Sequence, residues 1–202
     1  MGGSLTKDQP SGVRRLLHMS WTPWLPTLLL LIATVFALRG EGRRWWCACG
    51  QANLWIGNPQ SEHGSQHLFD PYSFTHILHG VLLCGVLAWI VPRLSLGRAL
   101  AATVFFEALW EVLENSEMII QRYRTGTVAL GYEGDSVANS LGDILSCGFG
   151  FLVARRIGLR WSIALVVASE LILLWWIRDN LTLNIVMLIW PIDAVKKWQT
   201  GT

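Results

Sequence analysis

The chain has 202 residues, of which 52% are hydrophobic and only 15% are charged. An average soluble domain carries about 25% charged residues, so this composition disfavours a soluble fold and suits a surface that faces lipid. The net charge of +2 and the four scattered cysteines argue against a nucleic-acid-binding surface and against a disulfide scaffold. The composition therefore predicts an integral membrane protein.

Five apolar segments approach the roughly 20 residues with which a helix crosses a bilayer. They cover residues 24–38, 73–91, 99–120, 137–154 and 161–177. A sixth run, 181–193, is shorter and contains Asn184 and Pro191, so it is either a thin sixth span or a helix in the interface. The sequence thus predicts an all-α integral membrane protein, a bundle of five to six transmembrane helices that forms a single membrane domain over residues 1–202.

The first apolar run has two interpretations. Arg14 and Arg15 precede it, and Val35-Phe36-Ala37 resembles a signal-peptide cleavage site. The length of the run, with Trp24 and Pro26 at its start, favours a span that is retained.

Basic residues predict the orientation, because loops on the cytoplasmic side are enriched in Lys and Arg. Alternating spans place three basic groups on one side, and with them a cytoplasmic N-terminus: Lys7, Arg14 and Arg15; Arg93 and Arg98; Arg155, Arg156 and Arg160. Lys196 and Lys197 would join that side if the sixth run crosses, which favours six spans. The opposite, outer side then carries loop 39–72, which is long for a mere connection.

Ionisable residues inside three spans form stripes with helical spacing. Such residues are costly in lipid, so they normally face the bundle interior and mark function. All three stripes fall in the outer halves of their helices, and we therefore expect one polar pocket that faces the outer side. Its candidate catalytic residues are His76, His79, Glu111, Glu114, Asp135, Asn139 and Asp143, with Glu107 on the same face as Glu111.

The pocket admits three kinds of chemistry. His76, His79, Glu111 and Glu114 are ligand types for a divalent metal such as Zn, Mn or Fe, which could activate water against a lipid phosphate or ester. Without metal, the same groups could exchange protons in catalysis or relay them across the membrane. The alternative is a hydrogen-bonded network that only holds the helices together.

The outer loop contains a second candidate metal site. Cys47 and Cys49 are followed by His63 and His67, and two Cys with two His could bind zinc. In an oxidising compartment the two cysteines could instead form a strained disulfide, or they could be free structural residues.

Several motifs resemble an uncharacterised bacterial family of multi-pass inner-membrane proteins with a domain of unknown function. They are Trp46-Cys47-x-Cys49-Gly50, Ser65-Gln66-His67, Asp70-Pro71-Tyr72-Ser73-Phe74-Thr75-His76-x-x-His79-Gly80, Trp110-Glu111-x-x-Glu114-Asn115-Ser116, Tyr123-Arg124, Leu130-Gly131-Tyr132-x-Gly134-Asp135-Ser136-x-x-Asn139-Ser140-x-x-Asp143 and Ile177-Arg178-Asp179-Asn180-Leu181-Thr182-Leu183-Asn184. This resemblance implies an inner-membrane location and no established activity.

A looser resemblance is to VanZ-like membrane proteins. It rests on the order of His76 or His79, then Glu111, then Asp135, Asn139 and Asp143 across consecutive spans. It implies a role near the cell envelope or its lipids, without a defined reaction.

The leading hypothesis is a pocket that binds or acts on an envelope lipid or a lipid-linked substrate. The alternatives are a non-enzymatic assembly or scaffold factor and a small proton-coupled transporter. The expected partners are membrane lipid and a second copy of the chain or another membrane protein, and no nucleic acid is expected. A divalent metal is the cofactor that the pocket could hold, and the sequence leaves open whether the protein is an enzyme.

Overall fold

The computed structural model describes residues 24–129 and 131–201, so Lys7, Arg14, Arg15 and Leu130 lie outside it. Within that part all the long elements of regular secondary structure are helices, as predicted. The helices are α2 (Trp24–Gly40), α3 (Ser73–Ile90), α4 (Leu96–Glu114), α5 (Glu117–Gly126), α6 (Val137–Ile177), α7 (Leu181–Ile189) and α8 (Asp193–Thr200).

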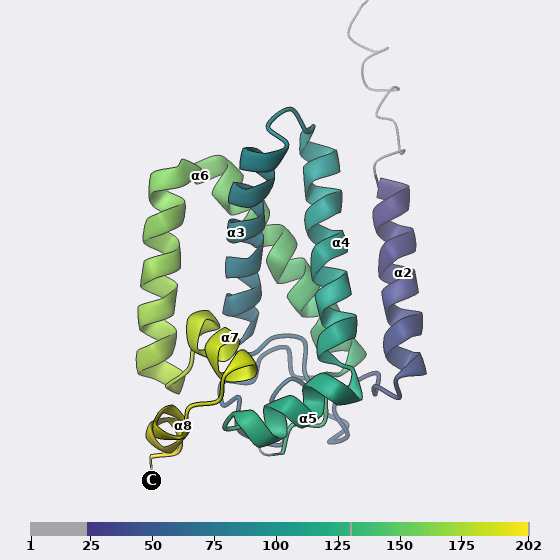
Figure 1. Cartoon of the computed structure of the whole chain (residues 1–202). Coiled ribbons are helices and arrows are strands. Elements are labelled where there is room, and N and C mark those ends of the chain that lie inside the picture. Colours follow the sequence, from purple (N-terminus) through teal and green to yellow (C-terminus); the bar gives the residue numbers. More distant parts are fainter. Residues whose placement is uncertain (1–23, 130, 202) are drawn as a thin grey trace, which may run out of the picture.

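Helix α6 is two helices joined at Gly158. This glycine has φ 77° and ψ 174°, a conformation that costs glycine little and other residues much. The chain therefore turns back, and residues 137–157 and 159–177 run side by side with α2, α3 and α4 between the same two ends of the molecule (Figure 1). We call the end with loop 91–95 and Gly158 the turn end. The opposite end, with segment 41–72, α5, α7 and α8, is the cap end.

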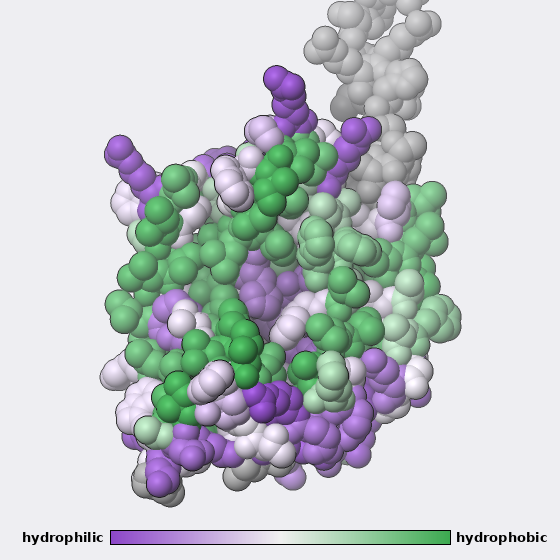
Figure 2. Space-filling view, in the orientation of Figure 1, coloured by the Kyte–Doolittle hydropathy of each residue, from purple (hydrophilic) through white to green (hydrophobic). Residues whose placement is uncertain are grey.

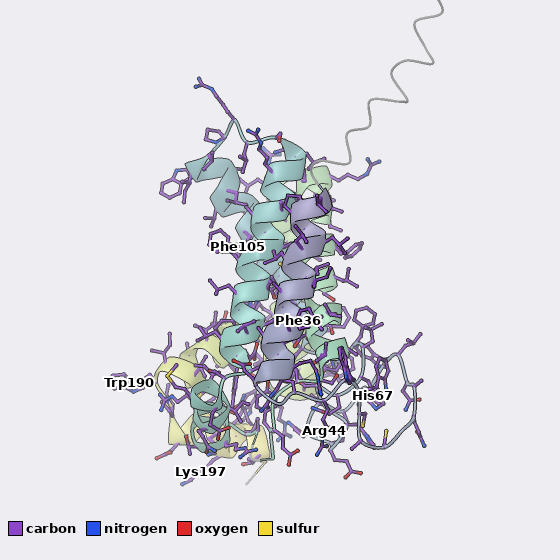
Figure 3. All side chains as sticks on the ribbon, turned by 90° about the vertical axis from the view of Figure 1, so that its right-hand side faces the viewer. Phe36, Arg44, His67, Phe105, Trp190 and Lys197 are labelled. Atoms are coloured by element: carbon purple, nitrogen blue, oxygen red, sulfur yellow. The ribbon has the colours of Figure 1, made fainter. Side chains whose placement is uncertain are left out.

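Two expected elements differ in the structure. The run 99–120 is divided, since α4 ends at Glu114 and Ser116 is the extended residue before α5. The sixth run gives only the nine residues of α7, about 14 Å of helix, which is too short to cross a bilayer. Lys197 lies at the cap end, as Arg44 does, and not at the end where a sixth crossing would have placed it (Figure 3).

Glycines let α3 and α6 approach each other closely. A Cβ atom at Gly80 would lie 1.9 Å from the carbonyl oxygen of Cys147, and one at Gly150 would lie 2.0 Å from that of Ile77. Small residues at such contacts are typical of helix packing in membranes. This crossing fixes the first turns of α3 against the first turns of α6, where the polar residues lie.

The outer surface of the long helices is hydrophobic. On the face shown in Figure 2, an apolar belt crosses the molecule, with hydrophilic residues gathered at the two ends. Exposed tryptophans lie near both ends of the belt, among them Trp89 at the turn end and Trp175 at the cap end. In the described part, α3 and α6 are long and apolar enough to cross a membrane. Helix α2 is apolar but shorter, and α4 carries Arg98 and three glutamates.

Candidate functional site

Four ionisable side chains from three helices meet in the centre of the bundle. Nδ1 of His76 on α3 contacts Oε1 of Glu107 and lies 3.4 Å from Oε1 of Glu111, both on α4. On the other side of the ring, Nε2 of His76 lies 3.8 Å from Oδ2 of Asp143 on α6. All four side chains are buried. The polar stripes expected from the sequence thus converge on His76.

Glu107 is the central residue that the sequence analysis left out of the candidate set. Its Oε1 and Oε2 lie 3.0 and 3.1 Å from Nδ1 of His79, so one carboxylate contacts both histidines of α3. The signal was present in the spacing, since Glu107 is four residues before Glu111 and shares its helix face. The sequence does not show how α3 and α4 are aligned along their axes, and therefore which glutamate of α4 lies level with the histidines of α3.

The four residues expected to bind one metal ion are divided between two groups that share His76, and Glu107 joins one of them. One group is His76, His79 and Glu107, and the other is His76, Glu111 and Glu114. Within each group the ligand atoms lie within 4.8 Å of one another. Among the described residues, neither carboxylate oxygen of Glu111 has a hydrogen-bond partner, although the side chain is fully buried. A buried carboxylate of this kind calls for a cation, a proton or a ligand.

Asp135 links α4 to the start of α6. Its Oδ2 accepts a hydrogen bond of 3.0 Å from Asn115, and its backbone N–H donates to Oδ1 of the same asparagine at 2.7 Å. The hydroxyl of Tyr132 donates to Oδ1 of Asp135 at 2.9 Å. Burial raises the pKa of Asp135 above its usual range. Ser136, and not Asp135, caps α6, by accepting a bond from the backbone N–H of Asn139.

Asn139 is also buried, on the first turn of α6. Its Nδ2 finds no acceptor in the part of the chain that the structure describes. Together with Glu111 it leaves donor and acceptor capacity unused near the centre of the bundle.

Two tyrosines that the sequence analysis did not select complete the polar wall at the cap end. The hydroxyl of Tyr72 donates to Oδ2 of Asp179 at 2.9 Å, and that of Tyr123 donates to Oδ1 of Asn184 at 3.0 Å. Burial raises the pKa of both tyrosines well above the usual value, so both hydroxyls stay neutral donors. Burial also raises the pKa of Asp179 to about 6. Tyr72 and Asp179 are 107 residues apart in the sequence, so no local sequence pattern indicates their hydrogen bond.

Helix α7 forms an apolar wall of the site and is held at both ends. Glu170 on α6 accepts hydrogen bonds from the backbone N–H groups of Leu181 and Thr182, at 2.9 and 3.0 Å, where α7 begins. Arg122 donates to the carbonyl oxygens of Leu188 and Ile189, at 2.6 and 2.8 Å, where α7 ends. Both contacts complement the dipole of the helix.

Part of this set of residues lines one cavity of about 920 Å³. Its polar lining includes His76, His79, Glu114, Asp135, Asp143 and Asp179, and its apolar lining includes Leu181, Ile185 and Leu188 on α7. Figure 2 shows hydrophilic residues in a hollow of the apolar belt, beside α3 and α4 and above α7. Polar groups in the interior of the bundle thus lie behind an opening in the hydrophobic surface.

Three residues of the second predicted site, Cys47, Cys49 and His63, also line this cavity. Sγ of Cys47 lies 3.3 Å from Nδ1 of His63, and Sγ of Cys49 lies 3.7 Å from Nε2 of His67. All four ligand atoms lie within 4.8 Å of one another. Both cysteines are free thiols, so the alternative of a disulfide between them is not observed.

Residues 38–201 match a family described as "Protein of unknown function (DUF2585)". The chain belongs to this family. It is similar to a UPF0314 protein of Sphingopyxis alaskensis, with 48% identity over 185 residues, which cover 91% of this chain and 97% of the relative. A UPF0314 protein of Paracoccus denitrificans is 42% identical over 179 residues, 89% of this chain and 93% of the relative. No solved structure matches.

The expected membership of an uncharacterised bacterial family is therefore confirmed. The descriptions of the family and of its members name no activity. Any function has to be argued from the site itself.

Proposed function

We propose that this protein crosses the bacterial inner membrane five times and binds the headgroup of an envelope lipid or lipid-linked molecule in its cavity at the cap end. The observation that carries the proposal is the mixed lining of one cavity. Buried His and carboxylate groups form its floor, and the apolar side chains of α7 form a wall next to the hydrophobic belt. An amphiphile needs both surfaces in one place.

Helices α2, α3 and α4 and the two parts of α6 on either side of Gly158 run between the two ends of the molecule (Figure 1), and this arrangement suits five crossings. The 18 residues of α3 give about 27 Å of helix, close to the thickness of the hydrocarbon core. Exposed tryptophans near both ends of the belt suit the two membrane interfaces. The charges on α4 do not oppose this placement, because Glu107 and Glu111 are buried against α3 and never face lipid.

The contacts of the basic side chains differ between the two ends of the molecule, and this difference supports a turn end on the cytoplasmic side. At the cap end most of them bind backbone carbonyls of the protein, as Arg124 does with Tyr132 and Lys196 does with Thr125. At the turn end, hydrophilic side chains project away from the body of the molecule (Figure 2). This end carries Arg93, Arg98, Arg155, Arg156 and Arg160 in the sequence. Because Lys and Arg beside spans favour the cytoplasmic side, we place the turn end there, and the cavity then opens on the outer side.

The charges around the cavity select among headgroups. Its lining contains Glu114, Asp135, Asp143 and Asp179, and Arg44 is the one arginine or lysine in that lining among the residues that the structure describes. Carboxylates only accept hydrogen bonds when ionised and repel a bare phosphate at short range. We therefore expect a headgroup that presents N–H or O–H donors, such as an amine or sugar hydroxyls.

A second candidate function is metal-assisted hydrolysis of such a lipid, and Glu111 is the observation that favours it. Its carboxylate is buried without a hydrogen-bond donor among the described residues and lies in a group with His76 and Glu114. A divalent cation there would satisfy Glu111 and could activate water against a phosphate or ester. Stoichiometric metal that is lost from Glu111→Gln would support this candidate.

The test is the identity of the lipid that stays with the protein. The full chain is purified from native membranes in a mild detergent, and bound lipids are extracted and identified by mass spectrometry. Wild type and Glu117→Gln, whose carboxylate is exposed on α5 outside the cavity, should retain lipid to a similar extent. Glu114→Gln should retain several-fold less. Equal retention by all three proteins would contradict the proposal. A wild type that carries a stoichiometric protein partner and no lipid would favour a scaffold.

A further inference from the structure

The segment between α2 and α3 brings together four atoms that can bind a metal ion. These are Sγ of Cys47 and Cys49, Nδ1 of His63 and Nε2 of His67. In a tetrahedral zinc site with Zn–S of about 2.3 Å and Zn–N of about 2.1 Å, sulfur and nitrogen ligands lie about 3.6 Å apart. The observed S···N distances of 3.3 and 3.7 Å match that separation. We propose that Cys47, Cys49, His63 and His67 bind one Zn²⁺ ion.

The groups behind the ligands are those that a zinc site needs. Nδ1 of His67 lies 3.1 Å from the carbonyl oxygen of Asn53, an acceptor that keeps the proton on Nδ1 and leaves Nε2 free for metal. Nε2 of His63 lies 3.8 Å from a carboxylate oxygen of Glu62, on the side away from Cys47. The backbone N–H of Gln51 donates to Sγ of Cys49 at 3.5 Å. Each of these contacts leaves the metal-binding atom directed at the centre of the group.

Two thiols so close to each other suit a divalent cation. The charge of a zinc ion would stabilise two adjacent thiolates, and their protons would be released on binding. Four protein ligands fill the tetrahedral shell, so the site is of the structural and not the hydrolytic kind.

The ion would brace the turn through which this segment contacts the start of α6. Between His63 and His67 the chain passes through Ser65, which has a φ of 57°, an uncommon left-handed conformation for a residue other than glycine. The carbonyl oxygen of Ser65 accepts a hydrogen bond of 2.9 Å from the N–H of Ser136, the residue that caps α6. The side chain of Gln66 donates to the carbonyl oxygen of Gly134 at 2.8 Å. Zinc would hold this strained turn in place, and with it the part of the cavity wall that Cys47, Cys49 and His63 form.

The inference does not rest on the proposed lipid ligand, and metal analysis tests it directly. The full chain is purified under reducing conditions with micromolar zinc, and its metal content is measured after removal of free ions. We expect about one zinc per chain in wild type and in Cys84→Ala, a thiol variant in the helix core. Cys49→Ser and His67→Ala should lose the ion, and His76→Gln, in the inner cluster, should keep it.

Cobalt provides a readout that does not depend on how well the variants fold. Replacement of zinc by Co²⁺ in wild type should give the visible bands of tetrahedral cobalt and a thiolate charge-transfer band in the near ultraviolet. The inner cluster offers only nitrogen and oxygen ligands and cannot give the latter band. The proposal is overturned if reduced wild type binds no zinc, if Cys49→Ser keeps it, if the cobalt spectrum lacks the thiolate band, or if native protein carries a Cys47–Cys49 disulfide.

Discussion

His76 and Glu107 are in direct contact at the centre of the bundle, where Nδ1 of the imidazole meets Oε1 of the carboxylate. The same Glu107 also contacts Nδ1 of His79. One carboxylate from α4 thus orients two histidines of α3, and the second ring nitrogen of His76 is left facing Asp143 on α6. The three helices are joined through this contact, so it serves both the stability of the bundle and the shape of the cavity floor.

Loss of the Glu107 carboxylate should therefore destabilise the fold. Glu107→Ala leaves two buried histidines without their common partner, and breaking a buried ion pair in this way typically costs about 3–5 kcal/mol. Thermal unfolding in detergent should show a clearly lower apparent Tm. Glu117→Gln on the exposed face of α5 should leave the apparent Tm unchanged within the error of the measurement. An equal effect of both changes would argue against a structural role for the contact.

The glycine contact between α3 and α6 gives a matched pair of variants on one helix. Gly80→Ala places a methyl group 1.9 Å from a backbone oxygen of α6 and should cost at least the 1–3 kcal/mol typical of overpacking. Gly85→Ala meets no described atom within 4 Å and should stabilise α3 by about 0.5–1 kcal/mol. We expect the apparent Tm of Gly80→Ala to lie below that of wild type and the apparent Tm of Gly85→Ala to lie above it. A neutral Gly80→Ala would show that the two helices pack differently in the membrane.

Stability should depend on the protonation of Asp179. Its pKa is raised from about 3.8 to about 6 by burial, so the folded protein holds this proton more tightly than the unfolded chain. The corresponding stabilisation is fully present below pH 4 and is lost as the pH rises through 6. Asp179→Asn mimics the neutral form and lacks this loss. We expect the apparent Tm of wild type to fall relative to the variant between pH 4 and 7, and a constant difference would contradict the assignment.

With five crossings, the C-terminus lies on the opposite side of the membrane from the N-terminus. Alkaline phosphatase fused after Thr202 should be active, because this enzyme matures only outside the cytoplasm, whereas a green fluorescent protein at the same position should be dark. Six crossings predict the reverse pair of results. The fusions thus decide between the structure of α7 described above and the sixth span expected from sequence.

Sequence alone predicted much of the helical framework. The apolar run 73–91 nearly coincides with α3, because twenty apolar residues in lipid have few alternatives to helix. Runs 137–154 and 161–177 correspond to the two parts of α6, and the turn at Gly158 falls between them. The run 181–193 was left open between a short sixth span and a helix in the interface. Apolarity alone does not reveal that its helix ends at Ile189, before Trp190 and Pro191.

The residue types of the site could be predicted from the sequence, and the contacts between those residues could not. Helical spacing placed His76 and Asp143 on inward faces, and residue types alone suggested the Cys47–His67 group. Partnerships such as Tyr72 with Asp179 arise from how distant segments fold over the cavity, and no local pattern encodes them. Glu107 was underrated because the relative depth of α3 and α4 is set by packing.

The most direct test of the proposed function compares two lipids of equal charge. Phosphatidylethanolamine carries N–H donors in its headgroup, whereas phosphatidylcholine carries none, so carboxylates of the cavity should distinguish them. A hydrogen bond to a charged group is worth about 1.5–3 kcal/mol, which corresponds to roughly tenfold or more in affinity. Native mass spectrometry of delipidated wild type titrated with each lipid should show that preference, and Glu114→Gln should reduce it. Equal binding of both lipids by wild type, or an unchanged preference in Glu114→Gln, would contradict the account.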